Sequence, residues 1–232
     1  MLKLEKITAG YGSSTVLRDV DIVVPTGSVA ALLGPNGAGK TSLLRVASGV
    51  IKPSAGRVVL NGEDVTGRSS SERARRGLCH VPEGRGIFPP LTVRQNLILF
   101  SPPGKERQSI ERAVEAFPDL SSRLTQTAGT LSGGQQQMVS LSRALISDAE
   151  VVLLDEVSMG LAPIIVDQIY EFIHALAASG RAILLVEQYV NKALDVADYV
   201  YILTRGRSTF AGDVRELDDD DVFSHYLGIE VS

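Results

Sequence analysis

Apolar runs separated by polar turns recur along the chain, and their lengths predict a mixed α/β fold. The continuously apolar runs lie at 29–33, 151–154 and 182–186. Such runs are typical of strands that lie in a parallel sheet and are buried on both faces. Apolar residues at helical spacing follow these runs at about 42–47, 163–178 and 191–195. We therefore predict a parallel sheet whose strands alternate with helices.

The N-terminal stretch has the alternation of a different kind of strand. Leu2, Leu4 and Ile7 alternate with charged residues, which predicts an edge strand exposed on one face. Residues 8–13 are expected to form a loop. Further strands are expected at 16–17, 20–24 and 57–60. This region is therefore predicted to form short antiparallel strands around the first strand–helix unit.

Between about residues 70 and 145 the pattern becomes mostly helical. Helices are expected at 71–77, 92–99 and 109–117. The stretch 80–90 contains too many glycines and prolines for regular structure. We interpret this region as a helical subdomain inserted within a single domain that spans residues 1–232. The later acidic run Asp218–Asp221 is expected to be a solvated loop or cap.

Composition excludes several classes of protein. The net charge of −4 gives no support for a nucleic-acid-binding surface. The single cysteine, Cys79, allows no internal disulfide and is expected to be a small buried residue. The first residues do not form the apolar region of a signal peptide, and no apolar run reaches the about 18 residues of a membrane span. We therefore expect any membrane association to go through a partner.

The segment Gly34–Thr41 (GPNGAGKT) is the strongest chemical signal in the chain. It follows the predicted strand at 29–33, opens a helix, and has the GxxxxGK[ST] spacing of a P-loop. Its glycines allow successive backbone N–H groups to converge on an anion, and the helix N-terminus adds donors. Lys40 is expected to reach the β- and γ-phosphates of a nucleotide, and the Thr41 hydroxyl to bind Mg²⁺. The alternative, a glycine-rich turn without a ligand, does not explain this spacing between these two elements.

Two carboxylates follow the apolar run at 151–154. Asp155 lies at the carboxyl end of the predicted strand, where a Walker-B aspartate holds Mg²⁺ beside a P-loop. Glu156 is then placed to orient or deprotonate a water that attacks the γ-phosphate. Adjacent acids at the end of a buried strand are costly to desolvate without such a role. The pair therefore predicts nucleotide hydrolysis.

Two further features each have a chemical and a structural interpretation. Ser132, Gly133 and Gly134 begin a predicted helix that runs to about residue 147, so they either bind an anion or cap the helix. Tyr11 either stacks on an adenine base or is a partly buried loop residue. At this level both pairs of alternatives stay open.

These motifs together resemble one family. The order and spacing of Tyr11, the P-loop, the LSGGQ segment at 131–135 and the Asp155–Glu156 pair are similar to those of ATP-binding-cassette (ABC) ATPases over essentially the whole chain. The resemblance implies an α/β P-loop NTPase core with a parallel sheet, an N-terminal antiparallel β subdomain and a helical subdomain. It also implies that ATP and Mg²⁺ are bound.

Three shorter segments narrow the resemblance to the ATP-binding subunits of branched-chain amino acid importers. These segments lie at 81–88 (VPEGRGIF), 160–163 (GLAP) and 185–188 (LVEQ). Glu83 stands where most ABC ATPases carry a glutamine that touches Mg²⁺. Gln188 stands where they carry a histidine that contacts the γ-phosphate. Val157 and Met159 also differ from the commoner residues, so the hydrolysis rate stays open.

The resemblance implies a set of site residues. The catalytic residues are expected to be Lys40, Glu156 and Gln188. The Mg²⁺ ligands are expected to be Thr41, Glu83 and Asp155. The ATP-binding residues are expected to be Tyr11, Gly34, Asn36, Gly37, Ala38, Gly39, Lys40, Thr41, Ser42, Ser132, Gly133 and Gly134.

The resemblance also implies partners. ABC ATPases work as pairs, so Ser132, Gly133 and Gly134 are expected to meet the nucleotide held by a second ABC ATPase subunit, which is either a non-identical subunit or another copy. Closure and reopening of the pair would drive transmembrane permease subunits. An extracytoplasmic solute-binding protein would act indirectly, and nucleic acid is not expected. The chain is then expected to lie peripherally on the cytoplasmic face of the cell membrane.

Other functions compete with this one. Import of urea or short amides, export of lipid or polysaccharide, and a soluble non-transport ABC ATPase are the alternatives. Exporters usually keep glutamine and histidine at the positions of Glu83 and Gln188, and the soluble proteins carry a long coiled coil or two cassettes. A P-loop kinase or GTPase gives no reason for the LSGGQ segment. The transported solute is not expected to contact this chain, so the sequence does not identify it.

Overall fold

The strands form two sheets in the computed structural model, which describes residues 1–84 and 86–217. The first sheet has the order β2-β1-β4-β5 and is antiparallel. Its strands are β1 (Leu2–Tyr11), β2 (Ser14–Val24), β4 (Ala55–Leu60) and β5 (Glu63–Asp64). The second sheet has the order β10-β9-β3-β8-β7-β6, and it is parallel except for the pair β9–β10. Its strands are β3 (Val29–Leu33), β6 (Leu78–Val81), β7 (Val151–Asp155), β8 (Ala182–Val186), β9 (Tyr199–Thr204) and β10 (Arg207–Asp213).

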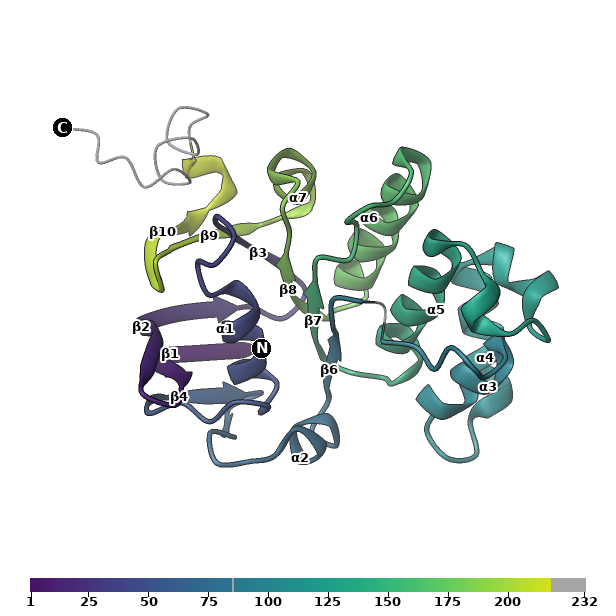
Figure 1. The fold of residues 1–232 in the computed structure, drawn as a ribbon, viewed down its shortest axis with the longest axis horizontal. Coiled ribbons are helices and arrows are strands. Elements are labelled where there is room, and N and C mark those ends of the chain that lie inside the picture. Colours follow the sequence, from purple (N-terminus) through teal and green to yellow (C-terminus); the bar gives the residue numbers. More distant parts are fainter. Residues whose placement is uncertain (85, 218–232) are drawn as a thin grey trace.

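Helices cover the parallel sheet and also form a separate group at one end of the molecule. The helices are α1 (Lys40–Ala47), α2 (Ser70–Ala74), α3 (Val93–Phe100), α4 (Glu106–Ala116), α5 (Gly133–Ile146), α6 (Pro163–Ala178) and α7 (Val190–Val196). Short 3₁₀ turns lie at Pro118–Arg123, Ala128–Thr130 and Val214–Glu216. Helices α3, α4 and α5 gather at the end opposite the antiparallel sheet (Figure 1). The helices expected at 92–99 and 109–117 correspond to α3 and α4, but β6 of the parallel sheet lies inside the predicted range 70–145, so the helical group begins only after β6.

Burial on both faces explains the continuous apolar runs. Val29, Ala31 and Leu33 of β3 pack into the core shared with α5 and α6, whereas Ala30 and Leu32 pack into the core shared with α1 and the antiparallel sheet. A strand with a core on each side has no polar face, so its sequence does not alternate. The α/β prediction is confirmed. Cys79 is buried, as expected for a small apolar residue.

Three local predictions were wrong. The stretch 80–90 is not wholly irregular, because β6 continues through residues 80 and 81. β1 is not an edge strand, because it pairs with β2 on one side and with β4 on the other. Residues 8–13 do not form a loop, because β1 continues to Tyr11 and a two-residue turn leads directly into β2. The alternation at Leu2 and Leu4 reports burial on one face of the sheet, and it carries no information on whether the strand lies at an edge. The acidic run Asp218–Asp221 lies outside the described residues.

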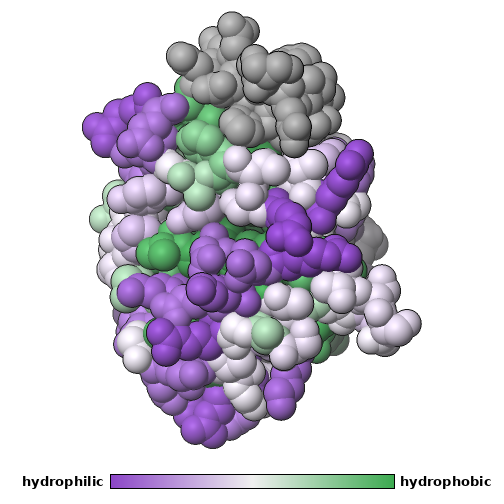
Figure 2. Space-filling view, turned by 90° about the vertical axis from the view of Figure 1, so that its left-hand side faces the viewer, coloured by the Kyte–Doolittle hydropathy of each residue, from purple (hydrophilic) through white to green (hydrophobic). Residues whose placement is uncertain are grey.

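The outer face of the antiparallel sheet is solvated. From Val20 to Val24, β2 alternates between buried and exposed residues. Figure 2, which views the molecule from the end that carries β1 and β2, shows mostly hydrophilic residues with hydrophobic ones between them. No helix within the described residues is long and apolar enough to cross a membrane.

A buried arginine holds the C-terminus of α1. Arg73 on α2 is 1% exposed, and its guanidinium donates to the carbonyls of Val46 (2.7 Å) and Ala47 (2.8 Å). It also donates to the carbonyls of Thr66 (3.1 Å) and Arg68 (3.2 Å). A cation at the C-terminus of a helix complements the helix dipole. The residue therefore fixes α1, the helix that the P-loop opens.

Replacing Arg73 with methionine is expected to lower the free energy of unfolding by about 3 kcal/mol, because buried carbonyls would lose their donors. Chemical denaturation of both proteins measures this loss. Arg68→Met is the matched control, since the exposed Arg68–Glu72 ion pair is worth under about 1 kcal/mol. Equal losses in the two variants would contradict the role of Arg73.

Candidate active site

The P-loop connects β3 to α1 through a backbone that requires glycine. Gly34 has a φ of 146°, and a Cβ added there would lie 2.1 Å from the Leu203 carbonyl oxygen of β9. Gly37 has a φ of 81°, and nothing lies within 4 Å of the place that a Cβ would take. The loop is therefore packed against the sheet at its start and open to a ligand at Gly37. The first N–H groups of α1 have no carbonyl partner within the helix, which suits an anion.

Lys40 lies at the start of α1 with its amine turned back over the loop. The side chain is 5% exposed, and Nζ donates to the carbonyls of Gly34 (2.7 Å) and Pro35 (3.2 Å). Burial lowers the pKa of Lys40, and the carboxylates of Glu156 and Asp155 oppose that change. The amine therefore sits between the loop and two acids, without an ion pair of its own among the described residues.

Asp155 is the last residue of β7, and its buried carboxylate has an oxygen without a hydrogen-bond partner among the described residues. The residue is 2% exposed, and this oxygen is Oδ1. Burial, together with the charges of Glu156 and Glu83, raises its pKa to about 6. An orphaned oxygen beside other acids fits a cation, which would favour the ionised form.

The oxygen donors around Asp155 are of the kind that Mg²⁺ prefers. No group of three or more His, Cys, Asp or Glu side chains in the described part of the chain could hold a metal ion. Mg²⁺ typically takes one or two carboxylates and completes its shell with phosphates and water. Thr41, in the first turn of α1, lines the same hollow as Glu83, which explains how few protein ligands could suffice.

Glu156 and Gln188 meet across the ends of two neighbouring strands. Gln188 Nε2 donates to Glu156 Oε1 (3.3 Å) and Oε2 (3.2 Å), and it also lies 3.2 Å from Asn36 Oδ1 of the P-loop. Glu156 has a φ of 48°, an unfavourable conformation for glutamate that is held by the Glu156 N–H bond to the Val186 carbonyl (2.9 Å). Strain of this kind at a polar cluster is typical of functional sites. Gln188 does not cap α7, whose N-cap is Tyr189.

A hollow of about 490 Å³ collects most of the predicted residues. Its lining comprises Asn36, Gly37, Gly39, Lys40, Thr41, Ser42, Glu83, Glu156 and Gln188, together with Val16 and Met159, which sequence reasoning did not assign to it. Gly34, Ala38 and Asp155 are buried and do not line it. The hollow lies at the carboxyl ends of the parallel strands β3, β7 and β8, which is where open α/β sheets bind ligands.

Tyr11 lies near the hollow without lining it. Its side chain is 46% exposed at the end of β1, and its hydroxyl lies 3.3 Å from Ser42 Oγ and accepts a hydrogen bond from Arg45 Nη1 (3.1 Å). The hydroxyl therefore contacts α1 while the side chain stays partly exposed. An exposed aromatic ring beside a phosphate-binding helix is available for stacking.

Ser132, Gly133 and Gly134 lie away from the hollow, at the N-terminus of α5. Ser132 is the N-cap of this helix, and its backbone N–H donates to Gln135 Oε1 (3.1 Å) in a capping box. A Cβ added at Gly134 would lie 2.9 Å from Ile165 Cγ2 of α6, so close helix packing requires this glycine. The segment therefore caps and packs α5, and the three residues do not line the hollow at this chain's own P-loop.

The acid Glu187 was not singled out from the sequence. It follows the apolar run of β8, is 0% exposed, and accepts a hydrogen bond from the Ser158 N–H (3.1 Å). The signal that identified Asp155, an acid directly after a buried strand, is present here as well.

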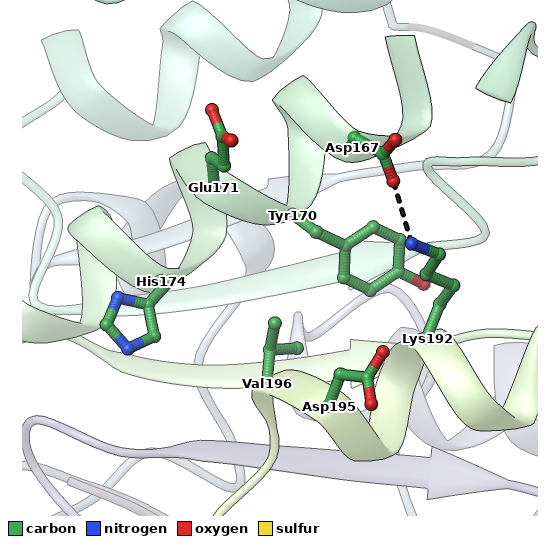
Figure 3. Close-up of a pocket in the computed structure, with 7 residues that line it drawn as sticks. All are labelled: Asp167, Tyr170, Glu171, His174, Lys192, Asp195 and Val196. Atoms are coloured by element: carbon green, nitrogen blue, oxygen red, sulfur yellow. Dashed lines mark hydrogen bonds and ion pairs between the residues drawn. The ribbon is translucent and has the colours of Figure 1, made fainter. Parts of the chain in front are cut away.

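A second hollow, of about 530 Å³, lies between α6 and α7 (Figure 3). Asp167 and Lys192 form an ion pair across it at 2.7 Å, and the Tyr170 ring lies between the two helices. Glu171, His174 and Asp195 complete its polar lining. It shares no residue with the hollow at the P-loop.

Known proteins are similar to this chain in sequence and in fold. The model of the ABC transporter family matches residues 17–159. The chain is 42% identical over 210 residues to the high-affinity branched-chain amino acid transport ATP-binding protein BraG of Pseudomonas aeruginosa, over 89% of this chain and 90% of that protein. It is 37% identical to the probable branched-chain amino acid transport ATP-binding protein LivF of Archaeoglobus fulgidus, over 96% of each.

An exporter protein and a solved structure are also similar. The lipopolysaccharide export system ATP-binding protein LptB of Haemophilus influenzae is 32% identical over 98% of this chain and 97% of its own length. The ADP conformation of MJ1267, an ATP-binding cassette of an ABC transporter, matches with a TM-score of 0.83 and 27% identity over 98% of each chain. The chain therefore belongs to the ABC transporter family, as one of its ATPase subunits.

Proposed function

We propose that this chain is the ATP-hydrolysing subunit of an importer for branched-chain amino acids. The relatives BraG and LivF, which carry that transport function in their names, support the substrate class. The observation that carries the chemical part is the meeting of Lys40, Glu156 and Gln188 at one hollow. A cation, a general base and a neutral hydrogen-bond donor around one cavity suit hydrolysis of a phosphoanhydride.

Each residue has a distinct proposed role. The P-loop N–H groups and Lys40 hold the phosphates. Thr41 and Asp155, with the help of Glu83, would hold Mg²⁺, which would supply positive charge beside the phosphates. Glu156 orients the attacking water and takes its proton, while Gln188 fixes the position of the Glu156 carboxylate. Adenine stacks on the exposed ring of Tyr11.

A second ABC ATPase subunit completes the site. Ser132, Gly133 and Gly134 lie away from this chain's own hollow, and the exposed Ser132 and half-buried Gly133 present the N-terminus of α5 to the nucleotide of a partner, while Gly134 packs the helix against α6. The N-terminus of the 14-residue helix α5 gives them the donors for a γ-phosphate. The partner is a related, non-identical subunit, with a homodimer as the alternative. An isolated monomer should therefore hydrolyse ATP poorly.

A groove of about 330 Å³ beside the loop of Glu83 is the proposed contact with a permease subunit. It lies between the parallel sheet and the helical group, and Phe88 and Leu99 line it while being 50% and 57% exposed. Apolar side chains exposed together at a groove are typical of protein contacts. This contact would hold the chain peripherally on the cytoplasmic face of the membrane. The solute-binding protein outside the membrane would act through the permease.

Gln188 is expected to act as a positional hydrogen bond, because its amide donates to Glu156 but cannot exchange a proton. Gln188→Ala should slow turnover by about 10- to 10³-fold, the cost of one oriented donor. Gln188→His should retain activity and gain an inflection between about pH 6 and 7, where histidine titrates. Turnover of the assembled transporter across pH measures both effects. Wild-type rates for Gln188→Ala at every pH would contradict this role.

Uptake into vesicles tests the proposed substrate. The complex of this chain with its permease and its solute-binding protein should accumulate labelled leucine when ATP is supplied, and Lys40→Ala should abolish the accumulation. LptB supports export as the second candidate. Intact ATP hydrolysis without uptake of leucine, isoleucine or valine would overturn the substrate class and leave the ATPase assignment standing.

A further inference from the structure

Glu187 is a fully buried acid next to the hydrolysis site. It follows β8, is 0% exposed, and faces the loop that comes after Glu156. Its Oε1 accepts a hydrogen bond from the Ser158 N–H at 3.1 Å, and its Oε2 lies 3.3 Å from the Gln188 N–H. Burial raises the pKa of Glu187, and the hydrogen bonds from Ser158 and Gln188 oppose this rise.

These contacts form a closed ring that includes Glu156 and Gln188, the two residues with proposed roles in hydrolysis. Ser158 comes two residues after Glu156, and Gln188 comes directly after Glu187. The Gln188 amide then returns to the Glu156 carboxylate at 3.2 Å. Beyond the Glu156 N–H bond to the Val186 carbonyl at the strand ends, two side chains join the segments: Gln188 at the hollow and Glu187 through the Ser158 N–H. A shift of either segment changes the distance from Gln188 to Glu156.

The cost of burying this acid indicates a role beyond packing. An apolar side chain of the same size would fill the end of β8 without desolvating a carboxylate. The Tyr170 hydroxyl of α6 is also buried near Glu187. Burial, together with the charge of Glu187, raises the pKa of Tyr170. Its ring is visible between α6 and α7 in Figure 3. Glu156 itself has a positive φ, which persists only where neighbouring contacts fix the backbone.

We propose that Glu187 is a positioning residue for ATP hydrolysis, which holds the Ser158 amide and the Gln188 backbone so that Gln188 and Glu156 keep their geometry. This inference rests on the proposed roles of Glu156 and Gln188. Glu187 does not line the hollow, so it acts through these two residues. Its loss should change the chemical step and leave ATP binding intact.

Steady-state hydrolysis by the assembled complex of the full chain tests this, with kcat and KM for ATP measured separately. Glu187→Met removes both acceptors at similar length, and Glu187→Asp keeps the charge but withdraws the oxygen from Ser158. Both should lower kcat by at least about tenfold, and up to about 10²-fold, the effect of misplacing reacting groups by about 1 Å. KM should stay within about threefold. Glu187→Gln retains a carbonyl acceptor and should restore kcat to within about fivefold of wild type.

Two further variants separate the explanations. Asp198→Met is the matched control, because Asp198 Oδ2 also accepts a backbone N–H, that of Val29 at 2.9 Å, at the other end of the sheet. Its kcat should stay near wild type even where its thermal stability falls. Glu156→Gln should be inactive in the same assay, and wild-type turnover there would overturn the proposed function itself. When Glu156→Gln is inactive, two results would overturn the role of Glu187 alone. One is a wild-type kcat in Glu187→Asp or Glu187→Met. The other is a loss of kcat in Asp198→Met equal to that in the Glu187 variants.

Discussion

Glu156→Gln is expected to slow ATP hydrolysis by about 10²–10⁴, the usual contribution of a general base. The substitution keeps the size of the side chain and its contact with Gln188, so the hollow should still bind ATP. In the proposed pair of subunits, hydrolysis would reopen the closed state, so the variant should also accumulate closed with ATP bound. Phosphate release by the assembled complex measures the rate.

The control for this experiment lies at the opposite end of the same strand. Glu150 precedes β7, is exposed, and accepts a hydrogen bond from Asn61 Nδ2 at 2.8 Å. Glu150→Gln makes the same chemical change on the same strand and should leave the rate within about threefold of wild type. Phosphate release near wild type in Glu156→Gln would show that another group takes the proton.

Lys40→Ala is expected to abolish Mg²⁺-dependent ATP binding or weaken it greatly. The amine is buried beside the loop, so its charge acts on a phosphate with little screening by solvent. Equilibrium binding of a fluorescent ATP analogue to the full chain measures the loss.

Two controls are needed for the binding measurement on Lys40→Ala. Lys52→Ala removes an exposed lysine shortly after α1 and should leave the affinity unchanged. Because the Lys40 amine also donates to two loop carbonyls, the unfolding midpoint of Lys40→Ala should be recorded to show that the loop is still folded. Unchanged affinity in a folded Lys40→Ala protein would contradict the assignment of Lys40.

The sequence predicted the parts of the fold that depend on local pattern. The strands β7 and β8 were visible as apolar runs, and Pro163 and the helical spacing after it predicted α6 with its observed bounds. The position of β1 was not predictable in this way, because alternation reveals one buried face and says nothing of pairing along the edges. The extension of β1 to Tyr11 was missed because Gly10 and Gly12 resemble a loop.

The site also has a part that local sequence predicts and a part that depends on the pairing of strands. The P-loop and Asp155 were predictable because their chemistry lies within one strand, one turn and one helix. The bond from Gln188 to Glu156 joins residues that follow two different strands, and the pairing of β7 with β8 brings them together. The positive φ of Glu156 and the burial of Glu187 also depend on that pairing, so neither could be derived from local pattern.

The most direct test of the hydrolysis site is the identity of the nucleotide that Glu156→Gln retains. The assembled complex of this variant, incubated with Mg²⁺ and ATP and then freed of unbound nucleotide, should hold unhydrolysed ATP, whereas the same complex carrying Lys40→Ala should hold none. Retention of ADP with wild-type release of phosphate by Glu156→Gln, or equal retention of ATP by Lys40→Ala, would contradict the account.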